Sequence, residues 1–138
     1  YLFKTQEMLC RVLAQKSDLG LRIREAYKEK DKAALEGIAK ADIPALIVLL
    51  DEFYHTFEQQ WNLENKSFGF EVQCARIGGL KQRLEYTKTM LERYLANEVT
   101  QIDELETEYL PFAYWASAED IRWTGYNLWK DTVSPGIV

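Results

Sequence analysis

The sequence predicts an all-α protein built as an antiparallel bundle of five to seven helices. Apolar residues recur at intervals of three and four along most of the 138 residues, which is the spacing of one helix face. Runs of alternating β-branched residues, the usual mark of strands, are absent from the sequence, and only 3 prolines interrupt it. With 47% apolar residues, a chain of this length is expected to form one globular unit, so we expect residues 1–138 to be a single helical domain.

The N-terminal helical pattern runs from Leu2 to about Lys30 and is interrupted by one glycine. Its stripe and the two positions beside it are apolar: Leu2, Leu9, Leu13, Ile23 and Tyr27, with Val12 and Leu19 alongside. Gly20 is either a close-packing point inside one long helix or part of a joint between two, for which Ser17-Asp18 would supply the cap. Both interpretations fit the sequence.

Two helices follow this segment. Asp31 suits the N-cap of a short helix from Lys32 to Lys40, in which Leu35 and Ile38 point inward. Asp42 begins the next helix, with Pro44 in its first turn, and this helix continues to about Leu63. Its expected buried stripe is rich in aromatic residues: Ile43, Leu46, Ile47, Leu50, Phe53, Tyr54, Phe57 and Trp61.

A polar break at 64–69 precedes a long helix from Phe70 to about Ala96. Its apolar face is expected to contain Phe70, Cys74, Ile77, Leu80, Leu84, Leu91 and Leu95. Gly78-Gly79 lies inside this helix, where each glycine costs roughly 1 kcal/mol relative to alanine. We expect a neighbouring helix or backbone to approach closely there.

Two shorter helices complete the expected bundle. Thr100 and Asp103 have the spacing of a capping box for a helix from Ile102 to Leu110, which Pro111 would end. Ser117 with Asp120 gives the same signal for a helix from about Ala118 to Lys130.

The charge pattern argues against two classes of partner. Net charge is −5, and the basic residues alternate with acidic ones, as in Lys28-Glu29-Lys30-Asp31, whereas a nucleic-acid binder shows a basic face. We therefore expect no nucleic-acid partner. No stretch approaches the roughly 20 apolar residues of a membrane span, so we also expect no membrane partner. Cys10 and Cys74 lie in apolar helical patterns as free thiols, which favours a cytoplasmic location.

No residue pattern in the sequence predicts a catalytic, cofactor or metal site. His55 is the only histidine, so the Glu52-x-x-His55 spacing cannot be repeated as a di-iron site requires. The adjacent acid pairs are Asp51-Glu52, Asp103-Glu104 and Glu119-Asp120. Each falls within or at the start of a predicted helix, so we interpret them as surface or capping acids.

Two regions are candidates for contact with a partner or a sugar. Aromatic residues concentrate near the C-terminus, and the candidates there are Trp115, Trp123, Tyr126 and Trp129. Aromatic faces can stack on sugars, but the helical spacing of the last three suits packing better. The second region is the joint between the two longest helices, with Trp61, Asn65, Lys66 and Phe68, followed on the second helix by Arg76 and Arg83. A joint that fixes the angle between the helices is the favoured interpretation.

Several segments resemble one known family. They are Tyr1–Thr5, Leu13–Gly20, the stretch Trp61–Gln73 with Glu-Asn-Lys-Ser-Phe-Gly-Phe-Glu-Val-Gln, and Arg76–Leu84 with Arg-Ile-Gly-Gly-Leu. They are similar to the helical C-terminal domain of a bacterial subgroup of exo-β-N-acetylhexosaminidases in glycoside hydrolase family 20. The similarity extends to about Leu110 and is weaker beyond it. Cys74 departs from the polar residue typical of that position in the family.

The resemblance implies a parent enzyme that removes terminal β-linked N-acetylglucosamine or N-acetylgalactosamine. In this family the substrate's own acetamido oxygen attacks the anomeric carbon, and an Asp-Glu pair on a catalytic barrel assists. Because the first residue is Tyr1, we expect this chain to be a C-terminal piece with the barrel upstream of it. None of the acid pairs here has that strand-end context, so the resemblance assigns no catalytic residue to this chain.

Three functional hypotheses follow. The first is an accessory domain that supports its own upstream barrel or forms a homodimer interface, with the glycan bound by the parent enzyme. The second is a carbohydrate-binding module that uses the C-terminal aromatic residues. The third is a free-standing helical interaction domain.

Overall fold

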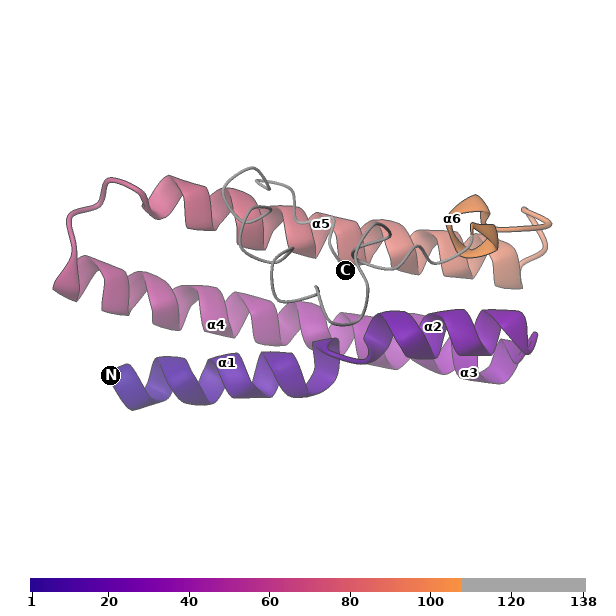
Figure 1. Cartoon of the computed structure of the whole chain (residues 1–138), viewed down its shortest axis with the longest axis horizontal. Helices are drawn as coiled ribbons and strands as arrows, with labels where there is room; N and C mark the ends of the chain where they lie inside the picture. Colours follow the sequence, from indigo (N-terminus) through magenta and orange to yellow (C-terminus); the bar gives the residue numbers. More distant parts are fainter. Residues whose placement is uncertain (108–138) are drawn as a thin grey trace, which may run out of the picture.

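In the computed structural model, which describes residues 1–107, three helical rods lie side by side and antiparallel (Figure 1). The first rod is α1 (Leu2–Lys16) followed by α2 (Leu19–Lys28). The second runs back without a break through α3 (Lys32–Gly37), the π-helical turn η1 (Ile38–Asp42) and α4 (Ile43–Glu64). The third is α5 (Phe70–Leu95), followed by the single turn α6 (Asp103–Glu106). The described residues contain no strand, which confirms the all-α prediction.

The helix count is slightly below the five to seven expected. Four long helices make up the described bundle: α1, α2, the continuous rod from Lys32 to Glu64, and α5. The expected break near Lys40 is absent because η1 carries the helix through, and Ile43 N–H bonds to Ile38 O. α4 begins at Ile43, with Asp42 at its N-cap and Pro44 in its first turn as predicted, but the Asp42 side chain makes no capping hydrogen bond. Its carboxylate instead accepts from Arg22 at 2.6 Å and ties the second rod to α2. The predicted helix over 118–130 lies outside the described residues.

The first rod contains a joint, as one of the two sequence interpretations required. α1 ends at Lys16 and α2 begins at Leu19, so Ser17 and Asp18 form the joint. Asp18 takes the N-cap position of α2, as that alternative expected, but its side chain makes no capping hydrogen bond. Gly20 lies inside α2, and no atom lies within 4 Å of the position that a Cβ would take there. It is therefore not a close-packing point.

The buried face of α1 is rotated from the predicted stripe. Thr5, Met8 and Val12 are buried, whereas Leu2 and Leu13 are about half exposed. α1 packs mainly on α4, and apolar residues occupy a broad arc of the surface of α1. Periodicity located that arc, but the contact with α4 decides which part of it is buried.

Two helices end in the same backbone motif. Lys30 after α2 and Asn97 after α5 both have positive φ, of 57° and 59°. In each case the next residue's N–H bonds back across the last turn, Asp31 to Ala26 and Glu98 to Arg93. This is the Schellman arrangement, which satisfies the last carbonyls of a helix. Asp31 also caps α3 through Ala34 N–H at 2.9 Å, as predicted.

Most of the buried core lies where α2, α3, η1 and α5 meet, and Met8 and Val12 of α1 extend it along α4. Leu35, Ile43 and Leu46 are completely enclosed there, beside Leu84 and Leu91 of α5. From Asp51 to Arg83 no apolar side chain reaches full burial, although the expected faces of α4 and α5 are partly covered there. The bundle is therefore well packed where α2, α3, η1 and α5 meet, and looser toward the α4–α5 connection. No helix among the described residues is long and apolar enough to span a membrane.

Two details of α5 and α6 differ from the sequence predictions. Gly78 has open space where a side chain would be, so no helix approaches it. α6 begins after Ile102 without a side-chain capping bond, and the predicted capping box is wrong. α6 is held by α2 instead. Arg24 donates to the carbonyls of Glu104 and Thr107, and Tyr27 accepts from Ile102 N–H at 3.1 Å.

Candidate interaction surface

The connection between α4 and α5 is a rigid corner built around Trp61. The indole N–H of Trp61 donates to the carbonyl of Lys66 at 2.8 Å, which closes the loop over the end of α4. Gly69 enters α5 with φ of 96°, a conformation that residues with a side chain rarely adopt. The Glu71 carboxylate accepts from Gly69 N–H at 2.7 Å. The loop is thus fixed at both of its ends.

Aromatic rings fill the inside of this corner. Phe70 is the hub: its ring lies 5.6 Å from Trp61, 5.7 Å from Tyr54 and 5.8 Å from Phe57, measured between centroids. Such tilted and edge-on contacts add to the stabilisation that area burial alone gives. The Tyr54 hydroxyl also lies 3.5 Å from Cys74 Sγ, and this hydrogen bond, with burial, raises the pKa of Tyr54. These rings hold α4 and α5 together where no deeper core exists.

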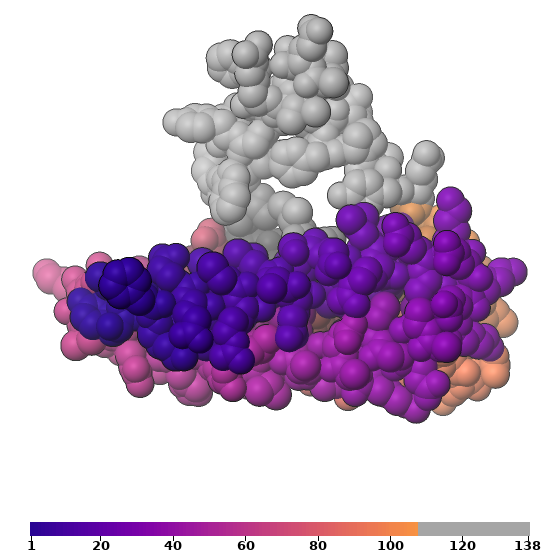
Figure 2. Space-filling model, turned by 90° about the horizontal axis from the view of Figure 1, so that it is seen from below, coloured from indigo at the N-terminus to yellow at the C-terminus, as the bar shows by residue number. Residues whose placement is uncertain are grey.

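Apolar side chains gather on the outside of the same end. Phe3 and Phe68 are the most exposed of them, at 91% and 84%. The set, which we call the end surface, comes from four segments, namely the start of α1, the end of α4, the connecting loop and the start of α5: Tyr1, Leu2, Phe3, Leu63, Phe68 and Val72. The Tyr1 hydroxyl donates to Glu64 at 3.1 Å, which joins the start of α1 to the end of α4. Figure 2 shows the N-terminal residues and the α4 end together at one extremity of the bundle.

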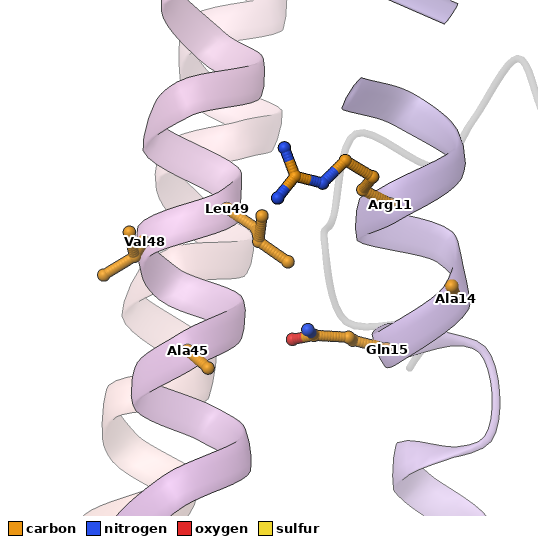
Figure 3. Close-up of a pocket in the computed structure, with 6 residues that line it drawn as sticks. All are labelled: Arg11, Ala14, Gln15, Ala45, Val48 and Leu49. Carbon is orange, nitrogen blue, oxygen red and sulfur yellow. The ribbon is translucent and has the colours of Figure 1, made fainter. Parts of the chain in front are cut away.

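A second surface feature is a groove between α1 and α4. It has a volume of about 500 Å³ and is lined by Arg11, Ala14, Gln15, Ala45, Val48 and Leu49. Arg11 and Gln15 reach from α1 toward α4 (Figure 3). Arg11 is occupied locally, with Met8 Sδ at 3.6 Å and Glu7 at 4.0 Å. The groove is shallow and open, and it presents no pair of groups suited to proton transfer.

The charged residues of the described bundle serve packing. Lys81 donates to both carboxylate oxygens of Asp51, at 2.8 and 2.7 Å, and ties α5 to α4. Arg83 pairs with Glu104, which raises the pKa of the Arg83 guanidinium, and so holds α6 on α5. His55 lies on the surface, 3.6 Å from Glu58. Within residues 1–107 no three His, Cys, Asp or Glu side chains come close enough to hold a metal ion.

A protein-family model described as the Glycoside Hydrolase 20C C-terminal domain matches residues 1–123. The chain belongs to this family. A search of curated proteins finds no match. The family match confirms the resemblance to the helical domain of family 20 enzymes and extends it past Leu110. For a Glycoside Hydrolase 20C C-terminal domain, association with a parent catalytic domain follows from the family itself.

The structure brings together only some of the residues that the sequence analysis proposed as contacts with a partner or a sugar. Trp61, Asn65, Lys66 and Phe68 share the α4–α5 corner, with Trp61 half-buried and the other three exposed. Arg76 is exposed on α5, beyond this corner. Arg83 lies two further turns away, stacked on Tyr86 at 5.3 Å as well as paired with Glu104. Trp115, Trp123, Tyr126 and Trp129, and the pair Glu119-Asp120, lie outside the described residues.

Sequence reasoning missed the apolar residues of the end surface. Phe3, Leu63 and Val72 do not belong to the predicted stripes, and each lies within the first or last turn of its helix. The signal that could have found them is an apolar residue near the end of a helix that lies outside the buried stripe. Cys10 was likewise expected in an apolar face, but it is exposed because the buried face of α1 is rotated. Cys74 is partly buried against Tyr54, as its place in the stripe predicted.

Proposed function

We propose that this chain is the non-catalytic C-terminal domain of a β-N-acetylhexosaminidase, where it supports the catalytic barrel that precedes it. The parent enzyme would remove terminal β-linked N-acetylglucosamine or N-acetylgalactosamine. Family membership supports the enzyme class. The non-catalytic role is supported by the interactions that the described carboxylates make.

The observation that carries the proposal is that three of the described carboxylates join one helix to another. Asp51 holds Lys81 of α5, Asp42 holds Arg22 of α2, and Glu104 holds Arg83 of α5. In family 20 the acetamido oxygen of the substrate is the nucleophile, and an Asp-Glu pair facing the bound sugar orients it and protonates the leaving oxygen. Acids engaged with cations on different sides of a bundle serve the architecture of that bundle.

An activity assay with a deletion tests the proposal. The 138-residue chain and the full parent enzyme are compared on a chromogenic N-acetylglucosaminide. We expect turnover from the parent and none from the chain. We also expect that the parent without residues 1–138 unfolds at a lower temperature, because the face of the barrel that the domain covers becomes exposed. Turnover by the chain alone, or unchanged thermal stability after its deletion, would contradict the proposal.

A further inference from the structure

We propose that the segment 108–138, which follows the described part of the chain, docks on the bundle, with the helix predicted over 118–130 as a fourth rod. The site is one side of the layer that α1, α4 and α5 form. We call it the Phe face and define it by five apolar residues: Leu9, Leu13, Phe53, Phe57 and Leu80. The inference is independent of the proposed function, because surface and occupant belong to the same chain. A second copy of the chain and the parent's catalytic domain are the alternative occupants.

The two sides of this layer differ in polarity. Toward the corner, α4 lies between α1 and α5 and packs on both, whereas α1 and α5 make no comparable contact with each other (Figure 1). One side of α4 bears Phe53 and Phe57, whose rings stack at 5.7 Å between centroids and are only partly buried. The other side bears exposed polar residues at helical spacing: Glu52, His55, Gln59 and Asn62.

α1 contributes Leu9 and Leu13 to the Phe face. The groove between α1 and α4 opens on the polar side of the layer, because Val48, which lines it, lies one turn before Glu52 (Figure 3). Arg11 reaches into this groove from one flank of α1. Leu9 and Leu13 are each two residues from Arg11, a rotation of about 200° around the helix. They therefore lie on the opposite flank, beside the Phe rings, and Leu13 is 48% exposed there.

α5 contributes Leu80. The next residue, Lys81, donates to Asp51, which lies one turn before His55 on the polar side of α4. Leu80 is rotated by about 100° from Lys81, and it packs against the buried core while remaining partly exposed. Leu80 therefore lies on the side of the layer that carries Phe53.

α6 delivers the chain to this side of the layer. Arg83 of α5 pairs with Glu104 of α6, and Leu80 lies one turn before Arg83 on the same side of α5. Arg24 of α2 donates to the carbonyls of Glu104 and Thr107, so the end of α6 is held between α2 and α5. The residues after Thr107 consequently start next to the Phe face, and this position favours them over any partner that must arrive by diffusion.

The remaining length of chain fits the face. Residues 108–117 can span up to about 33 Å when extended. The distance that they must cover along α5, from Arg83 back to Gln73, is only about 15 Å. A helix over 118–130 is about 20 Å long, close to the length of about 22 Å that α4 has from Leu50 to Glu64.

The sequence of this segment also fits. Four apolar residues at i, i+3, i+10 and i+11 share one side of a helix over 118–130: Ala118, Ile121, Leu128 and Trp129. Asp120 and Asn127 fall on the opposite side. So short a helix is marginal in water without tertiary packing. Docked with its apolar side on the Phe face, it completes a four-rod bundle.

The test uses the 138-residue chain in solution. Nuclear Overhauser contacts are sought between the side chains of Ile121, Leu128 and Trp129 and those of the Phe face. An equimolar mixture of isotope-labelled and unlabelled chains separates contacts within one chain from contacts between two. Hydrogen exchange is followed at the amides of residues 118–130, in this chain and in the full parent. The variant is Leu13→Gln, and the matched control is Leu21→Gln, since Leu21 is 60% exposed on the side of α2 opposite its buried residues.

We expect contacts within one chain, and exchange at these amides at least roughly tenfold slower than in an unstructured peptide. Leu13→Gln should reduce this protection roughly fivefold, because an apolar contact is lost, and Leu21→Gln should leave it unchanged. Contacts found only between chains overturn the inference in favour of a second copy. Protection that appears only in the parent overturns it in favour of the catalytic domain. Equal effects of the two substitutions, or no protection in either protein, also overturn it.

Discussion

Lys30 shows how a single backbone position limits the stability of this bundle. Its φ of 57° lies in the left-handed region, because the Schellman end of α2 requires it. For a residue with a side chain this conformation costs about 1–2 kcal/mol, whereas glycine adopts it without steric penalty. Glycine also has a more disordered unfolded state, which offsets part of the gain.

We therefore expect Lys30→Gly to raise the free energy of unfolding by about 0.5–1 kcal/mol. Lys28→Gly is the matched control, since Lys28 ends α2 in helical conformation. It should lower the free energy of unfolding by up to about 1 kcal/mol. Chemical denaturation of the 138-residue chain measures both. A loss of stability in Lys30→Gly would mean that the Lys30 side chain makes a stabilising contact.

Gly69 is the opposite case, a position that already holds the residue its backbone demands. At a φ of 96°, alanine would be strained, although its Cβ would meet only two ring carbons of Trp61, at 3.5 and 3.9 Å, which are ordinary contacts. We expect Gly69→Ala to lower the free energy of unfolding by about 1–2 kcal/mol. Gly20→Ala, in open space within α2, should raise it by about 0.5–1 kcal/mol. The same sign for both substitutions in denaturant titrations would refute this account of the corner.

At the scale of elements, much of the structure could be predicted from sequence. The patterns gave α4 and α5 to within one or two residues, and the Asp31 cap and inward Leu35 and Ile38 are confirmed. Periodicity carries this information because each face repeats with the helical turn. Periodicity could not determine which part of a broad apolar arc faces a neighbouring helix, and for this reason the prediction of the buried face of α1 was wrong.

The candidate site was predictable to a similar degree. The corner from Trp61 to Phe68 was recognised because a polar break with glycine separates two long patterns. Arg83 was grouped with it on sequence proximity, but α5 carries Arg83 away toward α6. The helix start at Asp42 and Pro44 was predicted correctly, but the π-helical turn η1 that joins it to α3 was not, because no residue pattern marks such a turn. The Asp42 carboxylate accepts a hydrogen bond from Arg22 of α2, a contact between distant residues that the local pattern does not indicate.

The attachment of α6 to α2 gives a pH-dependent prediction. Burial, and then the hydrogen bond to Glu106, raise the pKa of Tyr27 above its usual value of 10. Because the folded pKa is the higher one, this contribution to stability is complete below about pH 10 and is lost as the pH rises through the folded pKa. Deprotonation removes the O–H group that donates to Glu106 and places two negative charges side by side, so we expect α6 to separate from α2 and the Ile102 amide to lose protection in that alkaline range.

The control for this prediction is Tyr27→Phe, which removes both the titration and the hydrogen bonds. Its Ile102 amide should exchange faster at pH 8 and should show no further loss of protection that parallels the alkaline step of the wild type. Amide exchange corrected for its intrinsic pH dependence makes the comparison. Persistence of the same alkaline step in Tyr27→Phe would assign it to another group.

On the scale of the whole molecule, the bundle is uneven along its length, and this bears on how the domain serves its parent. The enclosed residues Leu35, Ile43 and Leu46 lie away from the α4–α5 corner, and Met8 of α1 extends the core along α4, whereas the corner itself depends on partly buried rings around Phe70. Stability within a protein follows local packing, so segments with few buried contacts open at lower free energy. The loosely packed half is also the half that presents the end surface. A partner on that surface would therefore stabilise the part of the domain that most needs it.

We expect the isolated chain to show two levels of hydrogen-exchange protection. Amides in α3, η1 and the first half of α4 should open only in global unfolding, because their side chains form the enclosed core. Amides from Phe57 to Ile77 should open at least about tenfold more readily, through separation of the α4–α5 corner. Leu46→Ala, which removes a fully enclosed side chain and should cost about 2–5 kcal/mol, should accelerate the core amides and leave the corner amides nearly unchanged, because the corner opens while the core stays folded. Phe70→Ala should accelerate both groups, because the ring contacts of Phe70 are lost both when the corner opens and when the whole bundle unfolds. Uniform protection along the chain, or acceleration of both groups alike by Leu46→Ala, would show that the bundle unfolds as one unit.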